Sequence, residues 1–242
     1  MGAIMPADLA SARRSPAGIA PLRAERQGPI LVLTLDRPAA RNSLSEAMIA
    51  ALHREVHAAA ETRDIRAIVL TGNGPAFCAG HDMKEMTARR TDADGGQAYF
   101  RDLMGRCSQM MQAIVRSPKP VIAAVQATAT AAGCQLVASC DLAVASSAAK
   151  FATPGVNIGL FCSTPMVALS RNVPRKRAME MLLLGELMTA EQAADWGLVN
   201  RVVAPDRVLA EAMAMAELIA SKSSATIAIG KRAFYDQLEL RL

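Results

Sequence analysis

Short apolar runs alternate with longer amphipathic segments along most of this chain, and that alternation limits its possible folds more than any other feature. The apolar runs at residues 30–35, 66–71, 120–125, 141–145 and 199–203 have the length of buried strands. Segments 46–62, 97–116, 174–184 and 189–196 repeat apolar residues at the three-to-four spacing of helices. Strands and helices that alternate in this way favour an α/β fold with largely buried sheets.

The two ends of the chain differ from this middle part. Residues 1–21 are rich in Ala, Arg and Ser and are interrupted by prolines, so we expect a disordered extension, with a transit peptide as the alternative. Residues 22–203 form the expected core, and residues 204–242 contain only helical patterns, at 206–221 and 225–240. Because no apolar run approaches the length needed to cross a bilayer, we expect no membrane span.

The charge balance and the cysteines restrict the ligands. The chain carries 27 Lys and Arg against 22 Asp and Glu, a net charge of +5 that suits an anionic small ligand. The basic residues are spread along the chain and only 3% of residues are aromatic, which disfavours nucleic acid as a partner. The five cysteines form no CxxC pair, so we expect neither disulfides nor a metal site, and a reducing compartment.

Two loops rich in small residues each follow a predicted strand. The first, residues 72–86, reads GNGPAFCAGHDMKEM, and the second, residues 127–135, reads ATATAAGCQ and leads into a predicted helix. Small side chains let a ligand approach the main chain closely, and the first N–H groups of a helix are free to donate. Facing one another, the two loops would form an oxyanion hole, a pair of N–H donors for a developing negative charge.

Four strings, in order along residues 22–235, resemble the crotonase superfamily, also called the enoyl-CoA hydratase/isomerase family. They are FCAGHDMKEM, KPVIAAVQATATAAGCQLVASCDLAVAS, KFATPGVNIGL and LLLGELMTAEQAADWGLVNRVV. The resemblance implies a crotonase-like spiral of ββα units with a C-terminal helical region that mediates trimer formation, as a homotrimer or a dimer of trimers. It also implies that the C-terminal helical region is incomplete at residue 242, and that the substrate is a coenzyme A thioester, with no separate cofactor.

The resemblance also assigns site residues. The backbone N–H groups of His81 and Ala132 correspond to the two oxyanion donors of the family, and Gln135 follows the second loop at a catalytic position. The positions that correspond to substrate and coenzyme A contacts are Ala40, Arg41, Ala79, His81, Asp82, Met83, Ala132, Gly133, Gly155 and Lys231.

The chain departs from the family where hydration chemistry takes place. Hydratases of the family use two glutamates to activate water, and here these positions are Gln135 and Gly155. A glutamine has no proton equilibrium near neutral pH and glycine has no side chain, so neither residue can act as a general base. The usual run of three glycines in the second loop is Ala131, Ala132 and Gly133.

We therefore expect an acyl-CoA-binding, hydratase-like protein of fatty acid metabolism, a lyase by family, in which ordinary hydration is weak or absent. The alternatives are a non-catalytic acyl-CoA binder and a thioester hydrolase or isomerase. The imidazole of His81 could act as a base, but a purely backbone role is favoured. Residues 162–164 could supply an acid, but packing by Cys162 and capping by Ser163 or Thr164 are favoured. The Arg- and Ala-rich composition favours a bacterial cytoplasm, with the mitochondrial matrix as the alternative.

Overall fold

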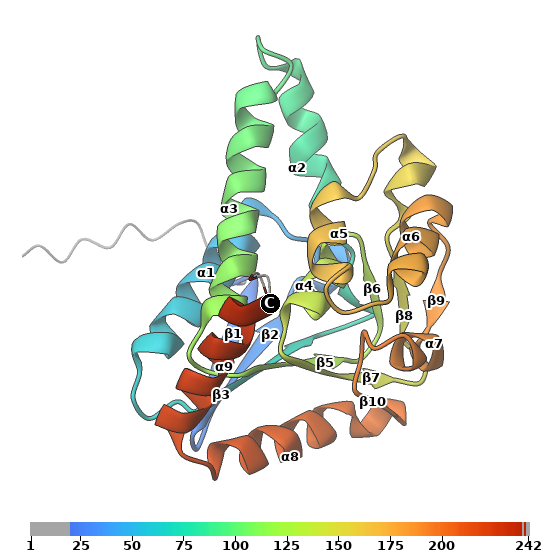
Figure 1. Ribbon diagram of the computed structural model, residues 1–242. Coiled ribbons are helices and arrows are strands. Elements are labelled where there is room, and N and C mark those ends of the chain that lie inside the picture. The colour runs from blue at the N-terminus through green and yellow to red at the C-terminus, as the bar shows by residue number, and fades with distance from the viewer. Residues whose placement is uncertain (1–19, 239, 241–242) are drawn as a thin grey trace, which may run out of the picture.

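The computed structural model describes residues 20–238 and Leu240, and it contains two β-sheets flanked by helices (Figure 1). The larger sheet has six strands in the order β1-β2-β3-β5-β7-β10. Adjacent strands are parallel, except that β1 and β2 form an antiparallel hairpin. Its strands are β1 (Leu22–Gln27), β2 (Ile30–Leu35), β3 (Ala67–Gly72), β5 (Val121–Val125), β7 (Leu142–Ser146) and β10 (Arg201–Val203).

A smaller sheet has the order β4-β6-β8-β9, in which β4, β6 and β8 are parallel and β9 is antiparallel. Its strands are β4 (Ala76–Cys78), β6 (Thr128–Thr130), β8 (Lys150–Ala152) and β9 (Met188–Thr189). The chain passes three times from a strand of the larger sheet into a strand of the smaller one and then into a helix: β3-β4-α2, β5-β6-α4 and β7-β8-α5. The predicted succession of ββα units is confirmed.

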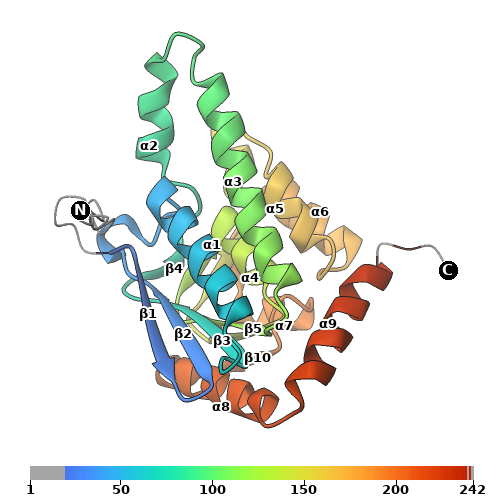
Figure 2. The same cartoon turned by 90° about the vertical axis from the view of Figure 1, so that its left-hand side faces the viewer.

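Nine α-helices lie within the described residues. They are α1 (Glu46–Glu61), α2 (Met83–Ala88), α3 (Gln97–Arg116), α4 (Ala132–Ser139), α5 (Ser163–Leu169), α6 (Arg175–Leu184), α7 (Ala190–Asp195), α8 (Val208–Ala220) and α9 (Ser224–Leu238). Figure 2 shows that α2 and the start of α3 project from the body as an arm. None of the helices in this part of the chain combines the length and the apolar character that crossing a bilayer requires.

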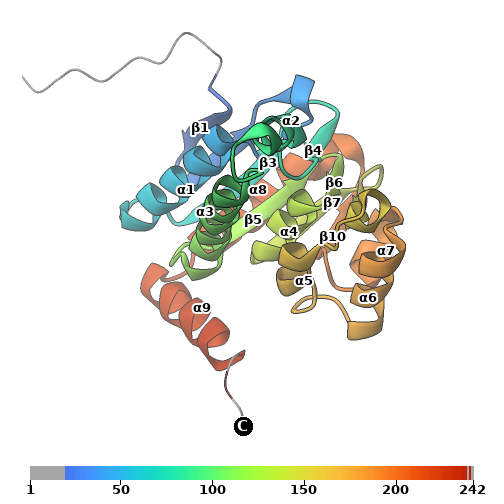
Figure 3. The same ribbon diagram turned by 90° about the horizontal axis from the view of Figure 1, so that it is seen from above.

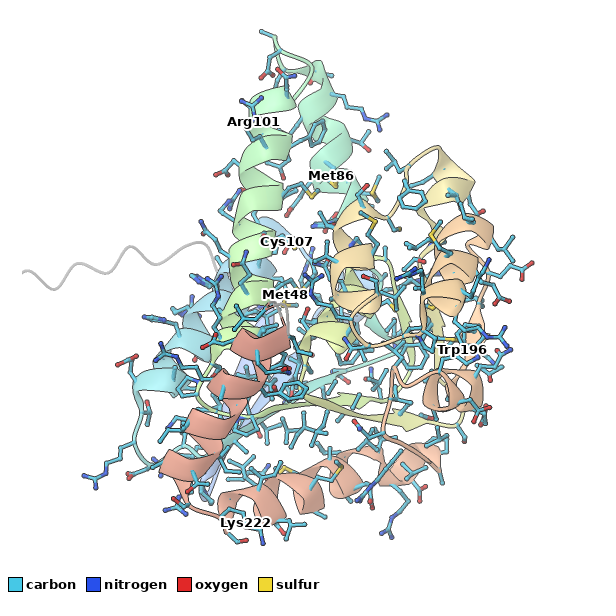
Figure 4. The ribbon with its side chains drawn as sticks, viewed as in Figure 1. Met48, Met86, Arg101, Cys107, Trp196 and Lys222 are labelled. Atoms are coloured by element: carbon cyan, nitrogen blue, oxygen red, sulfur yellow. The ribbon has the colours of Figure 1, made fainter. Side chains whose placement is uncertain are left out.

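The central strands β2, β3 and β5 of the larger sheet are buried on both faces, as their uninterrupted apolar runs predict. On β2, Leu31 and Leu33 belong to the main core, whereas Ile30 and Val32 contact the opposite layer. That layer is α8, whose buried Val208, Ala212 and Ala216 recur every four residues and meet the sheet from below in Figure 1. The main core, which includes Met48 and Cys107 (Figure 4), lies between the other face and helices α1, α3 and α4. Burial on both faces is typical of parallel sheets.

The two remaining sequence expectations for the ends have different outcomes. The predicted N-terminal extension comprises residues 1–21. Its first 19 residues lie outside the described residues. Both predicted C-terminal helices are present as α8 and α9, and Figure 3 shows α9 beside α3 at the margin of the molecule. No residue of α9 is buried, in contrast to α8. Helix α9 is therefore attached by few contacts.

Candidate functional site

The carboxyl ends of β4, β6 and β8 meet at one edge of the smaller sheet, because the three strands are parallel. Each strand leads into a segment that the sequence analysis singled out, beginning at Ala79, Ala131 and Thr153. The N–H of Ala131 donates to the carbonyl of Ala152 over 2.9 Å, which extends the β6–β8 ladder by one residue. The predicted site residues that follow these strands therefore lie side by side.

The two predicted oxyanion loops are in contact. Gly80 has a φ of +91°, and a Cβ built on it would lie 2.9 Å from the Cβ of Ala131 and 3.3 Å from the backbone N of Ala132. Only glycine permits this approach at low cost. Within the described part of the chain, the N–H groups of His81 and Ala132 have no acceptor. Since Ala132 is the first residue of α4, its free N–H lies at the positive end of the helix dipole.

The first turn of α4 presses directly on β4 at Gly133. A Cβ at this position would stand 2.1 Å from the carbonyl oxygen of Cys78, so no side chain fits. The strained residue of the second loop is Ala131, which has a φ of +51° and a ψ of −120°. A non-glycine residue in this region is uncommon and costs roughly 1–3 kcal/mol. Of the two alanines that replace glycines in this loop, Ala131 is therefore the one that carries backbone strain.

The loop that contains Ala40 and Arg41 lies against the first oxyanion loop. The N–H of Ala79 donates to the carbonyl of Arg41 over 3.1 Å, and Leu44 exchanges backbone hydrogen bonds with Gly80 and Asp82. The side chain of Arg41 is exposed and makes no hydrogen bond or ion pair with any described residue. A basic group free to meet an anion thus stands next to the first loop. Met83, which begins α2 directly after that loop, is 42% exposed.

The carboxylate of Asp82 is used within the protein. Burial alone would raise its pKa, but hydrogen bonds from Arg37, Ser43 and the N–H groups of Glu85 and Lys84 outweigh burial and hold the pKa below its ordinary value. The same carboxylate caps the N-terminus of α2. Asp82 therefore stays ionised and fixes the loop that carries His81.

The imidazole of His81 is partly buried. Its Nε2 atom is buried and has no hydrogen-bond partner among the described residues. Burial lowers the pKa of His81, so the ring is neutral near pH 7. In this arrangement no described acid or base exchanges a proton with it.

Gln135 and Gly155, which the sequence resemblance aligns with two glutamates, carry no acidic side chain. Gln135 is 8% exposed, and its Oε1 atom has no partner within the described chain. A Cβ at Gly155 would lie 2.6 Å from the carbonyl oxygen of Leu160 and 2.8 Å from Sγ of Cys162, so the volume of a side chain is already filled. Burial raises the pKa of Cys162, although the N–H of Gly155 opposes part of that rise, and its thiol stays protonated near neutral pH. Cys162 therefore fills space and offers no thiolate.

Two expectations are corrected here. Helix α5 begins at Ser163 without a side-chain cap, and the Ser163 hydroxyl donates to the carbonyl of Phe161 over 3.3 Å, so the predicted capping by Ser163 or Thr164 is wrong. Lys231 is not brought to the site. Its ammonium donates to Asp141 Oδ2 at 2.7 Å and to the carbonyls of Ile114 and Lys119 at 3.1 and 3.2 Å, beside the start of β5.

Thr153 is a site residue that the sequence analysis missed. It follows β8 at the same edge, is completely buried, and its hydroxyl has no partner among the described residues. A threonine after a strand carries no signal in the sequence. All five cysteines are free thiols, and no three His, Cys, Asp or Glu side chains of the described chain are grouped to hold a metal ion.

Comparisons with known proteins give a consistent result. The family model described as "Enoyl-CoA hydratase/isomerase" matches residues 25–242. Mouse enoyl-CoA hydratase domain-containing protein 3, mitochondrial, is 47% identical over 213 residues, which cover 88% of this chain and 69% of the mouse protein. Among solved structures, an enoyl-CoA hydratase of Mycobacterium smegmatis is 52% identical with a TM-score of 0.86, covering 92% of this chain and 85% of that one. Human enoyl coenzyme A hydratase domain-containing protein 3 is 45% identical with a TM-score of 0.87, covering 92% and 86%.

Proposed function

Because this chain belongs to the enoyl-CoA hydratase/isomerase family, we propose that it binds acyl thioesters of coenzyme A and holds the thioester carbonyl oxygen between the N–H groups of His81 and Ala132. The observation that carries the proposal is the contact of the two loops, with Gly80 placed against the backbone N of Ala132. Two N–H donors without acceptors on adjoining loops suit the negative charge that develops on a thioester oxygen. The guanidinium of Arg41 has no partner among the described residues and could bind a phosphate. This favours placing the coenzyme A phosphates on the outer side of the first loop.

We propose a hydratase-like protein that adds water to enoyl thioesters weakly or not at all. Gln135 and Gly155 provide no carboxylate, and the packing of Leu160 and Cys162 on Gly155 leaves no space for one. A positioned general acid or base typically contributes about 10²–10⁴-fold to a rate. An oxyanion hole without that pair still polarises a thioester, which keeps hydrolysis and isomerisation open as reactions. The double loss of the carboxylates favours non-catalytic acyl-CoA binding as the second candidate.

The purified protein should bind butyryl-CoA in calorimetry, with the acyl group adding affinity over free coenzyme A. With crotonyl-CoA it should lose the conjugated enoyl absorbance at least about 10²-fold more slowly than a family hydratase that has both carboxylates. No heat of binding would exclude the proposed site. Turnover equal to that of the two-carboxylate hydratase would instead contradict the roles given to Gln135 and Gly155.

The proposal includes self-association into a homotrimer or a dimer of trimers. Many large apolar side chains are exposed within residues 158–187, and exposed apolar surface commonly marks an interface. These side chains are Ile158, Leu160, Phe161, Met166, Val167, Met179, Leu183, Leu184 and Leu187. Sedimentation velocity should give about three or six times the 25.6 kDa chain mass. A single species with the mass of one chain would contradict this part of the proposal.

The compartment that we propose is a reducing one, which the five free thiols support. The mitochondrial name of the mouse relative favours the mitochondrial matrix, and the mycobacterial structure favours a bacterial cytoplasm.

A further inference from the structure

Two of the three histidines of the chain form a pair on the outer side of α1. His53 and His57 are exposed, and the centroids of their rings lie 6.4 Å apart with an angle of 27° between the ring planes. Residues four apart on a helix are surface neighbours, so the two rings follow one another along the helix axis. Neither imidazole forms a hydrogen bond or an ion pair with another described residue. Both rings are therefore free to bind a group from outside the fold.

Helix α1 holds the two histidines at a fixed spacing. Its buried residues pack into the main core and include neither histidine; they are Met48, Ile49, Ala51, Leu52, Val56 and Ala59. The Ser45 hydroxyl caps the start of the helix by accepting from the N–H of Met48 over 3.2 Å. The backbone under the pair is thus fixed by contacts that do not involve the imidazoles. Only the rotation of exposed side chains is needed to bring the two rings closer together.

A pair of imidazoles one helical turn apart suits a metal ion. Neutral imidazole is the commonest protein ligand for transition metals, and nickel, copper and zinc all accept it. A zinc–nitrogen bond is about 2.0–2.1 Å long, so both rings must turn toward a shared ion, which their exposure permits. Once one imidazole has bound, the second binds intramolecularly at a high effective concentration. The pair should therefore hold an ion more tightly than a single exposed histidine does.

We propose that His53 and His57 form a binding site for one divalent transition-metal ion of the class that prefers imidazole, such as nickel, copper or zinc. Water completes the coordination, because no third His, Cys, Asp or Glu side chain of the described chain is grouped with the pair. The missing CxxC motif bears only on cysteine sites, which this pair does not need. The site shares no residue with the proposed acyl-CoA site and does not depend on that function.

Calorimetry with nickel chloride at pH 8, on the full chain purified without a histidine tag, tests the site. Nickel is the probe because copper and zinc also favour cysteine sulfur, and the chain has five free thiols. The parent protein should bind one ion per chain. His53→Gln and His57→Gln should each bind at least about tenfold more weakly, since either change removes the second, intramolecular ligand. Equal affinity in the parent and in both variants would overturn the proposal.

A variant with the same histidine content is the matched control. His57→Ala combined with Ala58→His moves the second imidazole by one residue, to another exposed position. With about 3.6 residues per turn, residues 53 and 58 lie about 140° apart around the helix, so their side chains cannot reach one ion. This double variant should bind nickel as weakly as the single variants. Binding as tight as in the parent would show that pairing on one face of α1 does not hold the ion.

Thermal unfolding gives a second readout, because an ion that binds the folded helix stabilises the fold. At a free nickel concentration of about 100 times the Kd of the parent, the Tm of the parent should rise by roughly 5–10 °C. His57→Gln should rise by no more than about half as much at that concentration. An equal rise in the two proteins would contradict a site formed by the pair. Butyryl-CoA should bind equally with and without nickel, so a failure of butyryl-CoA to bind would refute the proposed function alone.

Discussion

Replacing Gly133 with alanine is expected to push α4 away from β4 and to abolish acyl-CoA binding. The added methyl group would start 2.1 Å from the carbonyl oxygen of Cys78 and 2.7 Å from its carbonyl carbon. Both are backbone atoms of a buried strand, so no side-chain rotation relieves the overlap. The helix must move, and with it the N–H of Ala132. We expect a loss of about 3 kcal/mol in the free energy of unfolding.

Urea unfolding and calorimetry with butyryl-CoA measure the two effects of Gly133→Ala. Gly105→Ala is the matched control, because Gly105 lies within α3 and a Cβ there would meet nothing within 4 Å. That variant should gain roughly 0.5–1 kcal/mol, since alanine favours a helix more than glycine does. A Gly133→Ala protein with the parent's unfolding midpoint and affinity would show that the α4–β4 approach is not needed for the site.

Replacing Asp141 with asparagine is expected to release α9 from the body of the protein. Asp141 accepts from the Lys231 ammonium at 2.7 Å, from the Tyr235 hydroxyl at 2.9 Å and from the N–H of Val121 at 2.7 Å. The Lys231 side chain is only 8% exposed. Removing one partner of a buried ion pair leaves the other charge uncompensated, at a cost of about 3–5 kcal/mol. Because α9 contributes no residue to either hydrophobic core, its departure relieves that cost more easily than unfolding of the core.

Limited trypsin digestion detects this release. Lys222 lies between α8 and α9 (Figure 4) and should be accessible in both proteins, whereas cleavage at Lys231 should become at least about tenfold faster in Asp141→Asn. Trp196, the single tryptophan, lies in the body and reports on the core by fluorescence during urea unfolding. Asp236→Asn is the control, because Asp236 pairs with Arg232 at 3.6 Å on exposed side chains, where an ion pair contributes little. Identical digestion of the parent and Asp141→Asn would show that other contacts hold α9.

The sequence predicts β2, β3 and β5 of the larger sheet well because each of them is a continuous apolar run buried on both faces, whereas the exposed and charged strand β1 was not predicted. The run at residues 30–35 coincides with β2, and the periodic segment at 97–116 coincides with α3. The three-residue strands β4, β6 and β8 are too short for any periodicity, and only their pairing with one another defines them. The candidate site lies at the edge formed by the carboxyl ends of these three strands. In the sequence, only the family motifs predicted that edge.

Side-chain partners were the least predictable part of the site. Lys231 was assigned to coenzyme A phosphates from a motif, yet its partner is Asp141, which is 90 residues away in the chain. The lack of space at Gly155 depends on where Cys162 and Leu160 pack, which no local pattern specifies. The role of Asp82 as the cap of α2 likewise became visible only in the structure, because no helix was predicted after it.

The hairpin strand β1 determines how the larger sheet ends. It is the outermost strand on its side, only Leu22 among its six residues is buried, and Arg23, Glu25 and Arg26 are exposed along it. A further strand that paired with this edge would have to bring its own side chains against these charges. The edge therefore discourages open-ended aggregation of sheets between molecules, and it leaves the helical surfaces as the places where copies of the chain can meet.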